Sequence, residues 1–130
     1  MTDVQLGSVT RFERAELIRR EREYRGIRPP VPVTGRIVIL VDEGLATSES
    51  MEAAVKAVRA LRPSRVVVAA PVGAPDACRQ LLGIADEVVC PLTPRRFGAV
   101  GAWYDDFRQT TDVEVRRLLD HVDAPLSWSA

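Results

Sequence analysis

The stretch that decides the fold is residues 38–50, which read Val38-Ile39-Leu40-Val41-Asp42-Glu43-Gly44-Leu45-Ala46-Thr47-Ser48-Glu49-Ser50. A run of apolar, mostly β-branched residues ends in two adjacent carboxylates, and a turn of small and hydroxyl-bearing residues then leads into a helix. Such an apolar run is typical of a buried parallel strand. Because ligands of open α/β sheets bind beyond the carboxyl ends of strands, this order predicts an acidic pair and a phosphate-binding turn at a sheet edge.

Length and composition indicate one compact globular domain. The chain has 130 residues, of which 46% are hydrophobic and 28% are charged. Its 18 basic and 18 acidic residues give a net charge of +0, so bulk charge predicts neither nucleic acid nor an anionic membrane as a partner. The two cysteines and the single histidine lack the spacing of metal ligands, so a zinc site is not expected and no metal-ligating residue is assigned. The sequence shows no signal-peptide pattern and no apolar run near the ~20 residues that span a bilayer, which predicts a cytoplasmic protein.

The hydrophobic pattern predicts strands that alternate with helices. Strands are expected at 37–41, 65–70 and 87–90, and helices at 49–61 and 76–84, with Met51, Val55, Val58 and Leu61 facing the sheet. This alternation is typical of βαβ units and a parallel sheet. Residues 1–10 carry no pattern and are expected to be a loose N-terminus. Residues 11–24 are expected to form a charge-rich helix, and a proline-rich connector follows. A last helix is expected from Asp112, as its cap, to about His121.

The chain resembles the type I phosphoribosyltransferases, in particular the C-terminal part of a bacterial phosphoribosyltransferase-like protein. The resemblance runs from about Glu13 through the last helix and rests on Tyr24-Arg25-Gly26, the 38–50 motif, Pro71-Val72-Gly73-Ala74-Pro75 and the segment from Trp103-Tyr104 to Gln109. It implies an α/β, Rossmann-like domain over residues 37–130 that is truncated on its N-terminal side. Residues 1–36 would be a tail, a charged helix and the connector.

The resemblance also implies roles for individual residues. Asp42 and Glu43 would be the catalytic pair, and they would hold the ribose diol of phosphoribosyl pyrophosphate (PRPP). The PRPP-binding set would be Asp42, Glu43, Gly44, Leu45, Ala46, Thr47, Ser48, Glu49 and Ser50. Mg²⁺ would bind together with PRPP and bridge its pyrophosphate and ribose oxygens. The implied activity, in nucleotide metabolism, is transfer of phosphoribosyl to an acceptor, as in other glycosyltransferases.

The aromatic segment at residues 97–107 has two interpretations. Trp103 and Tyr104 could stack on a base, because planar rings offer π-faces, and the neighbouring aspartates could serve as a general base or as magnesium ligands. Alternatively, the rings close the open end of the sheet while the aspartates face solvent.

Several departures from the family pattern favour a second hypothesis. Glu43 stands where an aspartate is usual, and Ser48 replaces a glycine, so its Cβ is expected to crowd the phosphate. Glu49 places a negative charge at the mouth of the phosphate-binding helix. No strand and glycine loop for pyrophosphate maps onto residues 1–36. The alternative function is therefore a non-catalytic regulatory or scaffolding domain. Separately, a small sheet with an unpaired edge strand favours association into a homo-oligomer.

Overall fold

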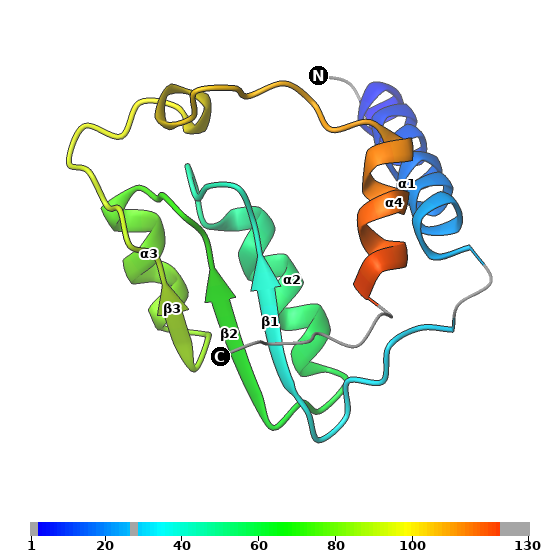
Figure 1. Cartoon of the computed structure of the whole chain (residues 1–130), viewed down its shortest axis with the longest axis horizontal. Helices are drawn as coiled ribbons and strands as arrows, with labels where there is room; N and C mark the ends of the chain where they lie inside the picture. Colours follow the sequence, from blue (N-terminus) through cyan, green and yellow to red (C-terminus); the bar gives the residue numbers. More distant parts are fainter. Residues whose placement is uncertain (1–2, 27–28, 123–130) are drawn as a thin grey trace. The chain divides into compact units, whose positions relative to one another are not determined.

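The computed structural model describes residues 3–26 and 29–122 of the chain (Figure 1). The chain divides into two compact units, one of Met1–Pro30 with Arg108–Ala130 and the other of Val31–Phe107. The domain boundary predicted between residues 36 and 37 stays a prediction. Parts of the two predicted domains, at residues 1–2, 27–28 and 123–130, lie outside the described residues.

A parallel sheet organises the unit Val31–Phe107. Its strands β1 (Ile37–Val41), β2 (Arg65–Ala69) and β3 (Glu87–Val89) follow the order β1-β2-β3, and both pairings are parallel. Helices α2 (Glu49–Arg59) and α3 (Pro75–Leu82) make the connections. The predicted α/β class and parallel sheet are therefore confirmed, and no end of these strands and helices differs by more than two residues from its predicted position.

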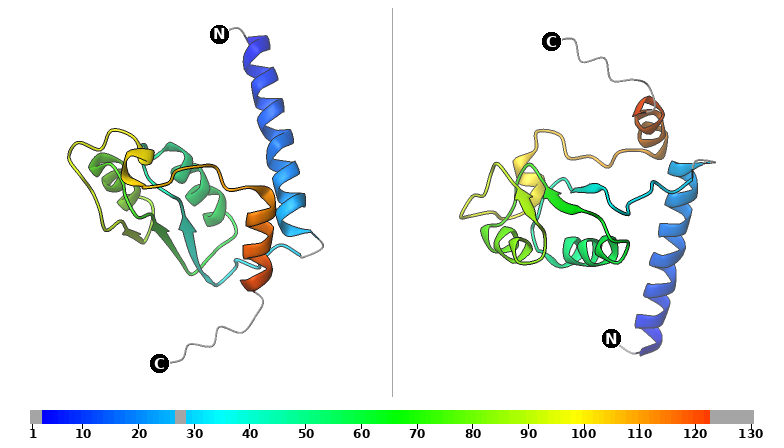
Figure 2. Two further views of the ribbon diagram at one scale, coloured as in Figure 1. Left: turned by 45° about the horizontal axis from the view of Figure 1, so that its top comes forward. Right: turned by 90° about the horizontal axis from the view of Figure 1, so that it is seen from below.

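The core lies between one face of the sheet and the two connecting helices, which both cover that face (Figure 2). Val66 and Val68 of β2 and Leu81 of α3 have no exposed surface, and Val55 of α2 packs in the same cluster. Burial of a side chain of this size contributes about 1.5–3 kcal/mol. The predicted inward face of α2 is thus correct for Val55, whereas Leu61 lies beyond the helix end and is exposed.

Strand β1 is buried on one side only. Ile37, Ile39 and Val41 expose 65%, 59% and 73% of their surface, while Val38 and Leu40 are half-buried. The prediction of a strand buried on both faces is therefore wrong for β1. The physical reason is that β1 is an edge strand and that both helices of its unit cover the same face.

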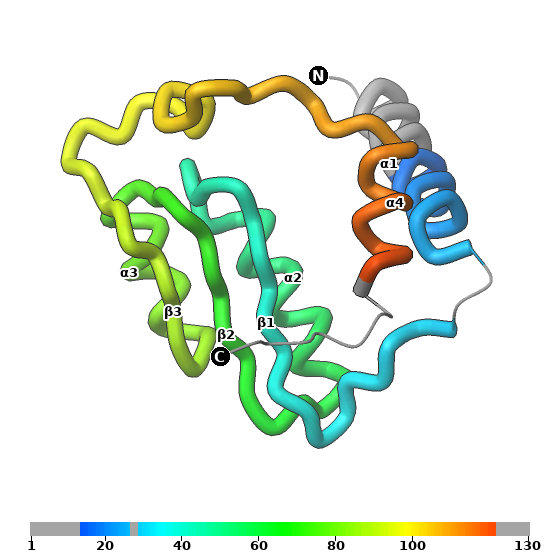
Figure 3. The backbone as a smooth tube through the Cα atoms, in the orientation of Figure 1, coloured from blue at the N-terminus to red at the C-terminus, as the bar shows by residue number. Residues whose placement is uncertain are grey.

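Figure 3 shows the backbone path of the turns that follow the strands. Backbone hydrogen bonds beyond the strand ends hold these turns together. The Asp42 N–H donates to the Ala69 carbonyl at 3.1 Å, and the Leu45 N–H donates to the Val72 carbonyl at 3.0 Å. Leu45 pairs with Gly73, and Val72 pairs with Leu92, in parallel bridges. The turn after β1 is therefore fixed to the turn after β2.

The other unit contains helices α1 (Asp3–Arg25) and α4 (Asp112–Val122). Helix α1 begins at Asp3, so the prediction of a loose N-terminus over residues 1–10 is wrong for residues 3–10. The helix-forming composition of residues 11–25 explains the difference. Once these residues form a helix, each residue added at its N-terminal end gains one hydrogen bond for one residue ordered, so the helix extends through residues 3–10. The helix carries the i,i+4 ion pairs Glu16–Arg20 and Glu21–Arg25.

The N-terminus of α4 is capped by Thr111 and not by Asp112 as predicted. Thr111 Oγ1 accepts a hydrogen bond from the Glu114 N–H at 3.2 Å, and Glu114 Oε2 accepts one from the Thr111 N–H at 2.8 Å. This reciprocal pair is a capping box. It leaves the Asp112 carboxylate free to bond with α1.

Candidate functional site

The acidic pair lies at the carboxyl edge of the sheet, as the sequence predicts. Asp42 directly follows β1 and is half-buried, and its Oδ1 accepts a hydrogen bond from the Glu43 N–H at 2.8 Å. Glu43 is exposed, and its carboxylate forms no ion pair within the described part of the chain. Both carboxylates are therefore placed where ligands of open α/β sheets bind.

The next two residues are held by packing. Leu45 is 1% exposed and belongs to the core, so only its backbone can face a ligand. A Cβ on Gly44 would lie 2.6 Å from Val100 Cγ1, so no side chain fits there without a shift. Gly44 and Leu45 thus shape the turn and do not add functional groups to it.

Ser48 occupies the N-cap position of α2 without capping it. Its Oγ lies 2.5 Å from Glu52 Oε1 and 2.6 Å from Gln80 Oε1, and its side chain is buried. Because a hydroxyl donates one hydrogen, Ser48 donates to the carboxylate and accepts from the Gln80 amide in its alternative orientation. The first-turn N–H groups of α2 therefore have no side-chain cap and are left for another acceptor.

A pocket of about 310 Å³ opens beside this turn. Its lining residues are Ala46, Thr47, Ser48, Glu49, Ala74, Asp76, Ala77 and Gln80. Helices α2 and α3 both begin at its wall, and no side chain caps α3 either. Two positive helix ends at one pocket favour an anion. The contribution of α3 was missed from the sequence, although β2 and its following turn must reach the same sheet edge as β1.

Two carboxylates at this pocket would repel an anion. Glu49 and Asp76 lie in the first turns of α2 and α3, and Asp76 forms an ion pair with Arg79. Glu49 has no ion pair within residues 3–26 and 29–122. Its charge would therefore directly oppose an anion in this pocket.

Replacing Glu49 by Gln is expected to tighten the binding of inorganic phosphate by about 2- to 5-fold, since a charge at a helix terminus contributes about 0.3–1 kcal/mol. Isothermal titration calorimetry at low salt measures the change. Glu21→Gln removes the same charge from α1, in the other unit, and should leave affinity unaltered. Equal gains in both variants would show that only net charge matters.

The aromatic segment lies against the strand end. The 3₁₀ helix η1 (Val100–Trp103) precedes Tyr104, whose hydroxyl donates to the Glu43 carbonyl. Trp103 is 40% exposed, with its indole N–H bound to the Phe97 carbonyl at 2.8 Å. The structure thus brings Tyr104 to the acidic pair, while a base-stacking role for Trp103 and Tyr104 stays a prediction.

Cys78 and Cys90 are free thiols beneath the turn after β2. A Cβ on Gly73 would lie 2.8 Å from Cys78 Sγ and 3.0 Å from Cys90 Sγ. Burial, together with the hydrogen bond to Cys78, raises the pKa of Cys90 to about 11. Because the thiolate is the reactive form, Cys90 is a packing residue, and Cys78 is buried in the core cluster.

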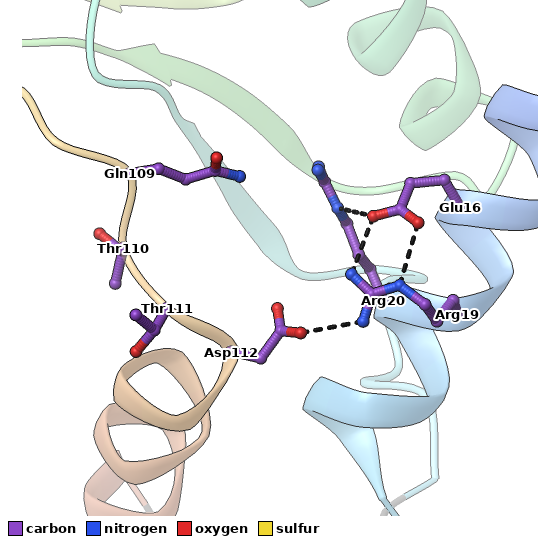
Figure 4. A pocket seen from close by; sticks show the side chains of 7 residues that line it. All are labelled: Glu16, Arg19, Arg20, Gln109, Thr110, Thr111 and Asp112. Atoms are coloured by element: carbon purple, nitrogen blue, oxygen red, sulfur yellow. Dashed lines mark hydrogen bonds and ion pairs between the residues drawn. The ribbon is translucent and has the colours of Figure 1, made fainter.

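The unit with α1 and α4 has a pocket of its own, also of about 310 Å³ (Figure 4). Its lining residues are Glu16, Arg19, Arg20, Gln109, Thr110, Thr111 and Asp112. Arg19 bonds to Glu16 at 2.8 Å and to Asp112 at 2.9 Å, and Tyr24 donates to Asp112 at 2.8 Å. Two arginines thus face two carboxylates in this pocket. The balance of charge indicates a structural contact between α1 and α4, which we call the joint and which consists of Glu16, Arg19, Tyr24 and Asp112.

This joint is expected to weaken in acid. The hydrogen bond with Arg19 lowers the pKa of Glu16 to about 2, and the hydrogen bonds with Tyr24 and Arg19 lower the pKa of Asp112. A lowered pKa means that the stabilisation is complete above the unfolded-state pKa of about 4 and is lost as the pH falls through the folded-state pKa. Urea titrations followed by circular dichroism at about pH 7 and about pH 2.5 should show the loss. Asp112→Asn should lose less between the two pH values, and an equal loss would contradict the joint.

The described residues hold no group of three or more His, Cys, Asp or Glu side chains placed for a metal ion. Two adjacent carboxylates suit a magnesium ion that takes most of its oxygens from a phosphate ligand and water. Among the described helices, none combines the length and the apolar character needed to cross a bilayer.

The candidate site thus combines an acidic pair at a strand end, a hydroxyl-bearing turn and an uncapped helix at the carboxyl edge of a parallel sheet. No protein-family model matches the sequence. Over 115 residues, the chain is 44% identical to proteins of Mycobacterium tuberculosis strains CDC 1551 and H37Rv, each named "Putative phosphoribosyl transferase". The match covers 88% of this chain, which spans about a quarter (26%) of the length of these curated relatives.

A crystal structure of TT1426 from Thermus thermophilus is also similar. Its TM-score is 0.77 at 44% identity, over 91% of this chain and 57% of that one. The resemblance predicted from the sequence is therefore confirmed: the chain is similar to part of proteins named putative phosphoribosyl transferases.

Proposed function

We propose that this chain binds PRPP or a ribose phosphate at the carboxyl edge of its sheet. Asp42 and Glu43 would accept hydrogen bonds from the two ribose hydroxyls. The turn from Ala46 to Ser50 and the α2 N-terminus would bind the phosphate. The observation that carries the proposal is the uncapped α2 terminus beside an acidic pair, in a relative of proteins named for this activity.

The uncapped N-terminus of α2 is informative because the residue at its N-cap has a hydroxyl that could cap it, yet this hydroxyl bonds with other side chains. Ser48 sits at the N-cap, yet its hydroxyl bonds with Glu52 and Gln80. The first-turn N–H groups therefore need an external acceptor, and a phosphate oxygen suits them. Thr47 is exposed beside them and can add a hydroxyl donor.

If the site is catalytic, the reaction would be transfer of phosphoribosyl to an acceptor. The acceptor nucleophile would form a bond to the anomeric carbon, while the bond to pyrophosphate breaks and its electron pair leaves with the pyrophosphate. The Asp42 and Glu43 carboxylates would orient the ring and stabilise positive charge that develops near the anomeric carbon. Mg²⁺, bound with PRPP beside the two carboxylates, would neutralise the leaving pyrophosphate.

The second candidate is a regulatory or scaffolding domain without catalysis. Two observations favour it: Glu49 and Asp76 place negative charge in the pocket, and the match covers a minority of the curated relatives' length. In that case a ribose phosphate would bind weakly, or no ligand would bind.

Thermal unfolding with PRPP, in the presence and absence of Mg²⁺, distinguishes the two candidates. A ligand at about 100 times its dissociation constant adds about 2.7 kcal/mol of stability. The proposed site predicts a magnesium-dependent rise of the midpoint that Asp42→Asn abolishes. An unchanged midpoint at millimolar PRPP would refute a PRPP site.

A further inference from the structure

The hydroxyl of Tyr104 makes a contact that the proposed function does not use. It donates a hydrogen bond to the backbone carbonyl of Glu43, 61 positions away in the sequence. The Tyr104 ring packs against Phe107, with 5.3 Å between ring centres and 39° between ring planes. The hydroxyl is therefore held toward the acidic pair by ring packing.

A second contact reaches the next residue of the same turn. The methyl groups of Val100 lie 2.6 Å and 2.8 Å from where a Cβ on Gly44 would be. Val100 thus packs directly on the Gly44 backbone. The peptide that joins Glu43 to Gly44 is held at its carbonyl by Tyr104 and at its α-carbon by Val100.

The segment that makes these contacts, residues 97–107, is held in place by further contacts. The Trp103 indole N–H donates to the Phe97 carbonyl at 2.8 Å, and Phe97 is buried at 8% exposure. A Cβ on Gly101 would lie 2.8 Å from Phe107 Cδ1, so the ring packs on that backbone too. These contacts tie residues 97–107 together and anchor them in the unit.

We propose that Tyr104 is a positioning residue for the ribose diol. It fixes the Glu43 backbone so that the carboxylates of Asp42 and Glu43 are set for two vicinal hydroxyls. A glutamate has one more rotatable bond than an aspartate, so fixing its backbone removes freedom that binding would otherwise have to order. This inference rests on the proposed ribose phosphate site.

The test compares two ligands on the full chain by isothermal titration calorimetry. Ribose 5-phosphate uses the acidic pair and the α2 N-terminus, whereas inorganic phosphate uses only the latter. Tyr104→Phe should weaken ribose 5-phosphate by about 5-fold, the effect of one hydrogen bond, and change inorganic phosphate by less than about 2-fold. Tyr24→Phe is the matched control, because it removes a phenol hydrogen bond to Asp112 in the other unit.

The outcomes separate this inference from the proposed function. If the wild type binds neither ligand, both are overturned. If the wild type binds ribose 5-phosphate and Tyr104→Phe binds it equally well, or weakens both ligands alike, only the positioning role is overturned. Val100→Ala loosens the contact of Val100 with the Gly44 backbone and should likewise weaken ribose 5-phosphate more than inorganic phosphate. This second variant tests the inference if Tyr104→Phe does not fold.

Discussion

Ribose 5-phosphate binding is expected to be lost when Asp42 is replaced by Asn and Glu43 by Gln. Each carboxylate would accept a hydrogen bond from a ribose hydroxyl, and a hydrogen bond to a charged group contributes about 1.5–3 kcal/mol. Removal of both charges should therefore lower affinity by more than about 100-fold. Isothermal titration calorimetry of the wild type and the double variant measures the loss.

The control for this loss is a double variant that removes two carboxylate charges elsewhere. Glu21→Gln with Glu23→Gln removes two carboxylates from α1, which lies outside the unit with the acidic pair. Its affinity for ribose 5-phosphate should match the wild type. Retained affinity in the Asp42 and Glu43 double variant would show that the strand-end carboxylates do not bind the ligand.

Replacing Gly73 by Ala is expected to destabilise the unit Val31–Phe107 by about 1–3 kcal/mol, the cost of overpacking a core. The new Cβ would lie 2.8 Å from Cys78 Sγ, 3.0 Å from Cys90 Sγ and 3.2 Å from Leu45 Cβ. Because Leu45 lies in the turn after β1, the clash would also move that turn. Urea unfolding followed by circular dichroism reports the change.

Gly83→Ala is the matched control for this substitution. Gly83 ends α3 with an ordinary φ of −73°, and its added Cβ would approach only the Gln80 carbonyl, at 3.3 Å. Its stability should stay close to that of the wild type. Cys78→Ala in the Gly73→Ala background should restore part of the loss, because it removes the nearest clashing atom. Equal stabilities of Gly73→Ala and Gly83→Ala would contradict this packing.

Much of the fold could be predicted from local pattern. The β2 strand, the inward face of α2 and the order of strands and helices follow from residues close in sequence. The one-sided burial of β1 could not be predicted, because it depends on which face the helices cover. The Thr111 capping box had a local signal, a threonine three residues before a glutamate, that favours Thr111 over Asp112 as the cap.

The candidate site, like the fold, could be predicted only where local sequence pattern specifies it. The position of Asp42 and Glu43 at the sheet edge follows from the strand that precedes them. The bond of Ser48 with Gln80 spans 32 positions and that of Tyr104 with Glu43 spans 61, so no local pattern specifies either. These long-range contacts explain why the sequence shows the acidic pair but not the residues that support it.

The most direct test of the ribose phosphate site is to locate the ligand by amide NMR on the isotope-labelled chain during titration with ribose 5-phosphate. The site predicts that the largest shifts fall on the backbone N–H groups of Thr47 to Met51 and on those of Asp42 and Glu43. Shifts confined to the pocket of Arg19, Arg20 and Asp112, or no shifts at millimolar ligand, would contradict it.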